Sequence, residues 1–358
     1  MSMRILHVIP QIKSGGAEIA AMSAIDYMNY QHDFKLIAIE PSHDNLFLDN
    51  VIYLRSSVYN PLAIFKLLNV IIREKPELVI FSLWKSSFLG LMLLPYLRLR
   101  NIKSLIIIHS ARYAHTIDRI VTKKAVKSFD EVFFDSESSR EFTLPEGSPK
   151  GSVISFILRR PPRKSFFPSD EKIKFVFVGR VNKVKNIKAA IKFVKTFDEL
   201  NLGKKILFHI YGPDEGDMQN CKDIVKENNL SSVVYFMGKI KSEDVPAILK
   251  KYDFYLQFSK MEGMAMSVVE AMQVGLIPCV TNVGQIEKYA KHLENSIIFD
   301  INKLDDVKYL AQMAKIIYSV ATDFHHFHKL SSSAANTFNN TPIYAEDLER
   351  NILRILHK

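Results

Sequence analysis

The sequence predicts an α/β protein with two Rossmann-like domains that face a cleft. Short apolar runs alternate with longer amphipathic runs through both halves of the chain, which is typical of parallel βαβ units. The length of 358 residues exceeds one ordinary core and suits two such domains. Three prolines and several polar residues within 159–169 indicate a linker between the halves.

The elements follow in order from these runs. In the first half, strands are expected at 5–9, 34–39, 78–81, 104–108 and 131–134, and helices at 17–30, 61–74, 88–99 and 119–127. In the second half, strands are expected at 174–178, 206–211, 233–237, 254–258 and 277–280. The first helix there is indicated by Ile187, Ala190, Ile191 and Val194 at helical spacing. We therefore expect one domain over 1–162, a second over 170–343, and a last helix over 344–358 that packs back on the first domain.

Composition narrows the class of protein. Cys221 and Cys279 lie far apart in unlike contexts, which argues against a disulfide framework and fits a reducing cytosol. Residues 3–9 are expected to form a strand and not a signal peptide. The net charge is +10, concentrated in the first half, which favours an anionic partner such as a membrane surface. No motif of a nucleic-acid-binding fold is present, so nucleic acid is not expected as a partner.

The segment 84–103 is apolar and ends in basic residues. Its apolar core is shorter than the about 20 apolar residues that span a bilayer, and it contains Pro95. A crossover helix of a βαβ unit is the leading interpretation. An interfacial helix that docks on a membrane is the alternative, and a transmembrane helix is the least favoured.

The most informative stretch is 262–272, where Glu262 and Glu270 flank the start of an expected helix. A helix N-terminus offers free N–H groups to an anion, and a carboxylate beside it can accept hydrogen bonds from sugar hydroxyls. An anion site beside a polyol site suggests a nucleotide sugar. Solvated surface glutamates are the alternative, which the apolar surroundings of Glu270 oppose.

Further candidates follow other strands. Gly179 and Arg180 follow residues 174–178, and Lys185 stands at the next helix start, so the two cations can clamp a diphosphate. The paired Gly15 and Gly16 open the first helix and allow close approach of a phosphate, although a simple tight turn is as good an interpretation.

The remaining strand ends add weaker candidates. His109 follows 104–108 and can bond a sugar hydroxyl or act as acid or base, although a structural histidine is the more usual finding. Gly212 and the run Gly238, Lys239 and Ile240 also end strands and are expected to face a ligand. The spacing of three histidines over 325–328 does not suit a metal, so neither a metal nor a cofactor is expected.

In this order and spacing, the motifs resemble those of retaining glycosyltransferases with the GT-B fold, specifically family 4 (glycosyl transferases group 1). The match is close in the second half and loose in the first. The resemblance implies that Glu262 bonds the donor sugar, Glu270 bonds the ribose, and Arg180 and Lys185 neutralise the diphosphate. It also implies that Gly15 and Gly16 face the phosphate across the cleft and that His109 faces the donor sugar or the acceptor.

The other donor contacts that the resemblance implies fall into two groups. They comprise the strand-end residues Gly179, Gly212, Gly238, Lys239 and Ile240, and the residues Gly263, Met264, Ala265, Met266 and Ser267 of the helix start. Family members usually read EGFG or EGMP where this chain has EGMA over 262–265, and often Gly-Gly where it has Gly284 and Gln285. These departures leave the identity of the sugar open.

The expected function is a metal-independent, retaining transfer of a hexose from a UDP- or GDP-sugar. The expected acceptor is a lipid-linked saccharide or polysaccharide in bacterial surface polysaccharide synthesis, for instance lipopolysaccharide. The expected location is cytoplasmic, peripheral on the inner face of the cytoplasmic membrane. The alternatives are a nucleotide-sugar epimerase on the same fold and a catalytically silent nucleotide-sugar-binding regulatory subunit.

Overall fold

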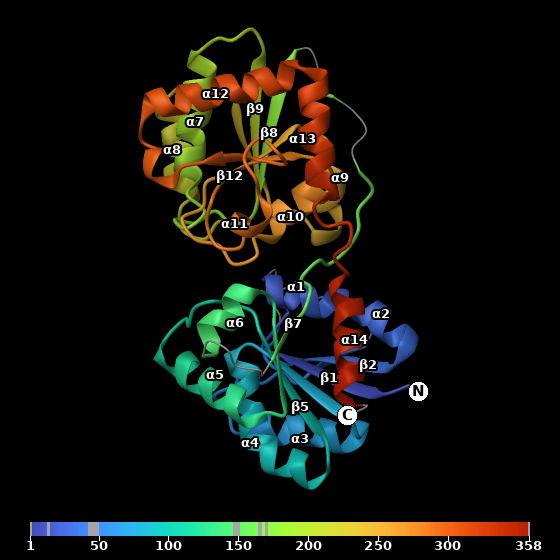
Figure 1. Ribbon diagram of the computed structural model, residues 1–358. Helices are drawn as coiled ribbons and strands as arrows, with labels where there is room; N and C mark the ends of the chain where they lie inside the picture. The colour runs from blue at the N-terminus through green and yellow to red at the C-terminus, as the bar shows by residue number, and fades with distance from the viewer. Residues whose placement is uncertain are drawn as a thin grey trace. The chain divides into compact units, whose positions relative to one another are not determined.

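The computed structural model describes residues 2–12, 15–41, 50–145, 151–163, 167–168 and 171–356. The chain forms two compact units, the first from Met1–Arg159 with Pro342–Lys358 and the second from Arg160–Thr341 (Figure 1). Each unit contains one parallel sheet covered by helices on both faces. The expected α/β fold with two Rossmann-like units is therefore confirmed. Within the expected linker, residues 164–166 and 169 lie outside the described residues.

The sheet of the first unit has seven strands in the order β3-β2-β1-β4-β5-β6-β7. These are β1 Arg4–Ile9, β2 Asp33–Ala38, β3 Val51–Tyr53, β4 Leu78–Ser82, β5 Lys103–Ile108, β6 Glu131–Phe134 and β7 Ser152–Val153. The five expected strands are present, whereas the short edge strands β3 and β7 were not expected because two or three residues carry no alternation that the sequence would reveal. β1 and β4 are neighbours, so the strand order reverses between them.

Helices cover both faces of this sheet. They are α1 Gly16–Ser23, α2 Ile25–Gln31, α3 Leu62–Glu74, α4 Trp84–Leu99, α5 Thr116–Ser128, α6 Glu137–Thr143 and α14 Tyr344–Leu356. The single helix expected over 17–30 is wrong, because α1 and α2 meet at Ala24. Ser23 Oγ donates to Ala20 O at 2.8 Å, a local bond that competes with the helical ladder, while the apolar pattern continues across the joint and hides the break.

The last helix α14 belongs to the first unit and packs on α1 and α2. Glu349 accepts a hydrogen bond from Tyr27 Oη at 3.0 Å and lies 3.0 Å from His32 Nε2. The backbone N–H of Ser155 donates to Asp347 Oδ2 at 2.7 Å. These contacts attach the C-terminal helix to the first unit although the whole second unit precedes it in the chain.

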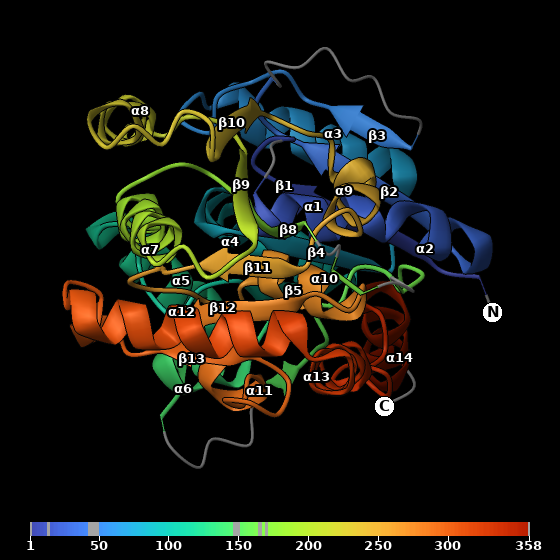
Figure 2. The same ribbon diagram turned by 90° about the horizontal axis from the view of Figure 1, so that it is seen from above.

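The second unit has a six-stranded sheet in the order β10-β9-β8-β11-β12-β13, and Figure 2 shows it from above. The strands are β8 Lys172–Val178, β9 Lys205–Tyr211, β10 Val234–Gly238, β11 Phe254–Gln257, β12 Ile277–Thr281 and β13 Ile297–Phe299. The helices are α7 Ile187–Glu199, α8 Met218–Glu227, α9 Val245–Leu249, α10 Met266–Gln273, α11 Ile286–Tyr289, α12 Val307–Thr322 and α13 Phe324–Asn336, with single turns at Ser242–Asp244 and Ile301–Lys303. Phenylalanines fill the core, with Phe175, Phe193 and Phe254 fully buried.

Among the described residues, no helix combines the length and the apolar character that crossing a membrane would require.

Candidate functional site

The strand order of the second unit creates a switch point between β8 and β11. The chain runs outward from β8 through β9 to β10, then returns to β11 on the other side of β8. The loops that follow β8 and β11 therefore leave neighbouring strands in opposite directions. In open parallel sheets this is where ligands bind.

Lys185 and Glu262 meet at this switch point. Lys185 Nζ lies 2.7 Å from Glu262 Oε1, and the two side chains are only 15% and 8% exposed. Lys185 ends the loop after β8, and its position is fixed by its N–H, which donates to Asn182 Oδ1 at 3.0 Å. The structure thus brings together two of the residues that the sequence singled out, and they form a nearly buried ion pair.

A second layer of side chains holds Glu262 in place. Gln257 Nε2 donates to the same Oε1 atom at 3.0 Å. Gln257 Oε1 is in turn within 2.9 Å of Tyr255 Oη and 3.2 Å of Ser267 Oγ. Sequence reasoning missed Gln257 and Tyr255, because they belong to β11 and read as part of a buried strand. The polar Gln257 at the end of an apolar run is the signal that could have indicated them.

Burial raises the pKa of Tyr255, and the charges of Glu262 and Glu270 act in the same direction. Tyr255 is therefore a neutral hydrogen-bonding group at neutral pH. Glu270 lies on α10 with 8% exposure, so both expected carboxylates occur near one buried phenol.

The start of α10 is built around an unusual backbone. Ala265, its N-cap, has φ 56° and ψ 59°, the left-handed region that favours glycine. Tyr289 Oη donates to Met264 O at 3.0 Å, which holds the preceding turn. Gly263 and Met266 flank this turn. The EGMA departure therefore places a strained alanine at the helix start, next to the N–H groups that α10 offers.

Arg180 does not join Lys185 in an ion pair with Glu262. Its Nη1 lies 3.1 Å from Glu215 Oε1, and Asn182 Nδ2 donates to the other oxygen of Glu215 at 3.1 Å. The side chains of Arg180 and Glu215 are 53% and 40% exposed, so this ion pair is accessible to solvent. Glu215 lies in the turn after β9, and the structure pairs it with Arg180, a candidate phosphate ligand.

Three expected glycines form a row across the ends of β8, β9 and β10. The N–H of Gly179 donates to Tyr211 O at 2.9 Å, and the N–H of Gly212 donates to Gly238 O at 2.8 Å. A Cβ on Gly212, which has φ 144°, would stand 1.8 Å from Gly179 O. This close backbone approach requires glycine. Lys239 and Ile240 directly follow the edge strand β10, and Lys239 is exposed.

Gly284 is a further structural glycine at the site. It has φ 61°, and a Cβ there would stand 2.0 Å from Glu262 O. The N–H of Gln285 donates to Gly263 O at 3.1 Å. The turn after β12 therefore supports the backbone of Glu262 directly.

In the first unit, His109 follows β5 and shares a serine hydroxyl with a second histidine. Ser82 Oγ lies 3.0 Å from His109 Nε2 and 2.8 Å from His7 Nε2. Burial lowers the pKa of both imidazoles to about 3, and the charge of His109 adds to this effect for His7. Both rings are neutral at neutral pH. Because Ser82 has one proton, it donates to one ring and accepts from the other, so the two rings carry opposite tautomers.

His7 was missed as a partner of His109 because it stands inside an apolar strand. Within the described part of the chain, the Nδ1 atoms of both rings are buried without a hydrogen-bond partner. Of the paired glycines, Gly15 caps α1 and Gly16 begins it, while the preceding Ser14 lies outside the described residues.

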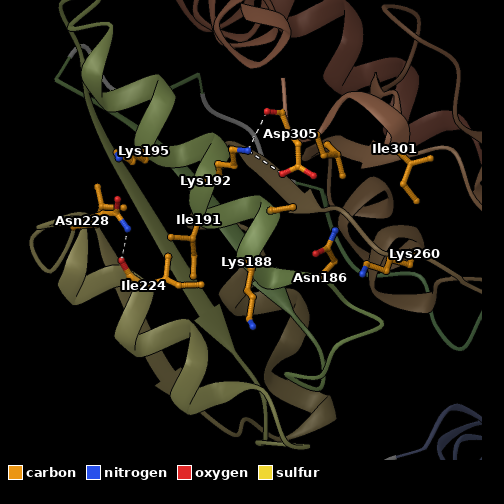
Figure 3. A pocket seen from close by; sticks show the side chains of 13 residues that line it. Asn186, Lys188, Ile191, Lys192, Lys195, Ile224, Asn228, Lys260, Ile301 and Asp305 are labelled. Carbon is orange, nitrogen blue, oxygen red and sulfur yellow. Dashed lines mark hydrogen bonds and ion pairs between the residues drawn. The ribbon is translucent and has the colours of Figure 1, made fainter. Parts of the chain in front are cut away.

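A hollow on the second unit lies along α7 and has a volume of about 640 Å³ (Figure 3). Lys188, Lys192 and Lys195 line it, and Lys192 Nζ pairs with Asp305 Oδ1 at 2.8 Å. Asn186 and Lys260 also line the hollow and are near neighbours of the site residues in sequence, but Lys185 and Glu262 are not among its lining residues.

The known proteins to which this chain is similar include glycosyltransferases. Residues 159–318 match the family model of Glycosyl transferases group 1. An uncharacterized glycosyltransferase of Methanocaldococcus jannaschii is 30% identical over 207 residues, which are 55% of this chain and 51% of that protein. A GDP-mannose:cellobiosyl-diphosphopolyprenol alpha-mannosyltransferase of Xanthomonas oryzae pv. oryzae is 24% identical over 95 residues, which are 26% of this chain and 24% of that protein. The matched region thus spans about half the length, or less, of these curated relatives.

Among solved structures, HepE of Anabaena in complex with UDP-glucose superposes with a TM-score of 0.78 at 15% identity, over 99% of this chain and 100% of that one. At this identity the likeness shows the fold. The second unit is therefore similar in sequence to the Glycosyl transferases group 1 family, and the chain as a whole has the two-unit GT-B fold of glycosyltransferases.

Proposed function

We propose that this protein is a retaining glycosyltransferase that moves a hexose from a UDP- or GDP-sugar to a lipid-linked saccharide. The observation that carries the proposal is the Lys185–Glu262 pair at the switch point of a domain similar to Glycosyl transferases group 1. The solved HepE complex contains UDP-glucose, and one relative is named for GDP-mannose and a diphosphopolyprenol acceptor. These names support the donor and acceptor classes.

In the proposed reaction, the bond between the anomeric carbon and the diphosphate oxygen breaks. The acceptor oxygen forms its bond to the anomeric carbon on the same face, and its proton passes to the departing phosphate. Lys185, Arg180 and the free N–H groups at the start of α10 neutralise the charge that develops on the diphosphate. No metal has a step in this scheme.

The carboxylates hold the sugars of the donor. Glu262 accepts hydrogen bonds from hydroxyls of the transferred sugar, and Glu270 accepts them from the ribose. In the structure, Lys185 pairs with Glu262 and Arg180 pairs with Glu215. Donor binding therefore begins with an exchange of partners, in which the diphosphate draws on cations that carboxylates now hold.

The proposed acceptor class and the positive net charge of the chain support a proposal about the cellular location and the pathway of the enzyme. We propose that it works in bacterial surface polysaccharide synthesis, peripherally on the inner face of the cytoplasmic membrane. His109 would then contact the donor sugar or the acceptor from the first unit as a neutral group.

A donor panel tests the proposal. The purified protein is mixed with UDP- and GDP-sugars and a bacterial lipid extract, and nucleotide release is followed. We expect release with one donor that requires the extract and is lost in Glu262→Gln and in Lys185→Met. Lys192→Met is the matched control, because its pair with Asp305 lies in the hollow along α7. Full activity in both site variants would refute the proposal, and release of an altered sugar nucleotide without acceptor would indicate an epimerase.

A further inference from the structure

The two helical layers of the first unit differ in chemistry. Helices α3, α4 and α5 pack side by side on one face of the sheet, with α4 in the middle, and α1, α2 and α14 cover the other face (Figure 1). We call the outer surface of α3, α4 and α5, with the residues that cap the first two, the α3–α5 face. All of its residues are described.

Charge is distributed unequally between the two layers. The three helices of the α3–α5 face, with the caps Lys75 and Arg100, carry ten Lys or Arg and two carboxylates, Glu74 and Asp118. Helices α1, α2 and α14 carry five carboxylates and two arginines. Since the whole chain has a net charge of +10, most of the excess resides in this one layer.

The same layer exposes large apolar side chains. Eight of them, with exposures between 37% and 79%, belong to the three helices: Leu62, Phe65, Ile72, Phe88, Met92, Leu99, Ile117 and Ile120. On the opposite layer, within the described residues, only Tyr30 of α2 is a comparably exposed large hydrophobic residue. Large exposed apolar side chains that gather on one helical layer indicate a candidate interaction surface.

The residues are arranged so that both kinds of contact are available together. On α4, Phe88, Met92 and Leu99 recur at helical spacing on the exposed side, and Arg100 caps the helix. On the neighbouring α5, Lys123, Lys124 and Lys127 are exposed, and among the described ion pairs none involves these three lysines. Apolar groups with cations beside them match the boundary between acyl chains and anionic headgroups.

We propose that the α3–α5 face docks on a bilayer of anionic lipids. A nucleic acid would use the cations but leave Phe88, Met92 and Leu99 in water, so a lipid surface explains both observations where nucleic acid explains one. The docking rests on the proposed function only for its purpose, which is to bring a lipid-linked acceptor to the enzyme. The surface itself follows from charge and exposure.

Vesicle flotation tests the docking. The full chain is mixed with vesicles of phosphatidylglycerol or of phosphatidylcholine, and bound protein is measured at about 50 mM and about 500 mM salt, since screening acts over the Debye length. We expect binding to phosphatidylglycerol that falls at high salt. The triple variant Lys123→Gln/Lys124→Gln/Lys127→Gln should bind roughly 100-fold more weakly.

Matched variants separate charge from apolar contact. The control Lys226→Gln/Lys251→Gln/Lys308→Gln removes three exposed lysines from the second unit and should bind like the parent protein. At high salt, Phe88→Ser/Met92→Ser should bind vesicles more weakly than the parent protein does. Tyr30→Ser on the opposite layer should bind vesicles like the parent protein. The circular dichroism spectrum and melting temperature confirm that each variant is folded.

Several outcomes would overturn the docking proposal. One is that the protein does not bind phosphatidylglycerol vesicles, and another is that both triple variants lose vesicle binding equally. A third is that the protein binds nucleic acid tightly without binding vesicles, and a fourth is that it forms a dimer that Phe88→Ser dissociates and that does not bind vesicles. Nucleotide release in detergent solution should be unchanged in the Lys123 triple variant. If the Lys123 triple variant loses vesicle binding but keeps nucleotide release, the docking is separate from the proposed function. If the protein binds vesicles but releases no nucleotide, only the proposed function is refuted.

Discussion

Lys185 Nζ and Glu262 Oε1 lie 2.7 Å apart although the two residues are 77 positions apart in sequence. Their side chains are 15% and 8% exposed, so each is costly to leave without its partner. Gln257 adds a second donor to the same carboxylate oxygen. The pair is thus a structural contact of the second unit, and under the proposed function it is also the contact for which the donor diphosphate competes.

Removing one member of this pair should lower the free energy of unfolding more than removing both members. Lys185→Met leaves a nearly buried carboxylate with one amide donor, so we expect it to destabilise the second unit. In the double variant with Glu262→Gln that charge is gone, and the coupling between the two changes should be roughly 1–3 kcal/mol. Calorimetry of the four proteins measures it. Strict additivity would show that the contact does not form in solution.

Glu215 should compete with the donor diphosphate for Arg180. The Arg180–Glu215 pair is half-exposed and worth at most about 1 kcal/mol, so Glu215→Gln should tighten UDP or GDP binding by up to about fivefold. Titration calorimetry measures the change. Glu243→Gln is the control, because its pair with Lys241 is more exposed and distant from this turn in sequence. Weaker nucleotide binding in Glu215→Gln would mean that Glu215 itself holds the ligand.

Much of the fold was predictable because it depends on local pattern. The alternation of strands and helices indicated both sheets, and placing residues at strand ends brought Lys185 and Glu262 to one region. Contacts that depend on the approach of distant backbones were not predictable. Gln257 and His7 read as parts of apolar strands, and their roles appear only when Glu262 and Ser82 reach them. The joint at Ala24 was hidden because the apolar pattern continues through it.

Gly284 provides a steric test of how Glu262 is supported. Gly284→Ala would place a Cβ 2.0 Å from Glu262 O at a backbone angle, φ 61°, that alanine disfavours. We expect a loss of about 2–4 kcal/mol in stability and loss of nucleotide binding. Gly263→Ala is the matched control for stability, since a Cβ there meets nothing within 4 Å. Equal melting temperatures for the two variants would contradict the close approach of the 284 turn to Glu262.

His7 should make the first unit sensitive to acid. Its pKa is lowered by burial to about 3 in the folded protein, so below pH 6.5 the unfolded chain binds a proton that the folded chain does not. The contribution of His7 to stability is therefore complete above pH 6.5 and falls as the pH drops from 6.5 toward 3, by roughly 2 kcal/mol at pH 5 for this one group.

Melting temperatures of the parent and of His7→Gln at pH 7.5 and 5.0 measure the effect, and the melting temperature of the variant should fall less on acidification. His325→Gln, on an exposed position of α13, should behave like the parent. An imidazole resonance of His7 that titrates near pH 6.5 would show instead that the ring is reached by water, and the shared hydroxyl of Ser82 would then not fix its tautomer.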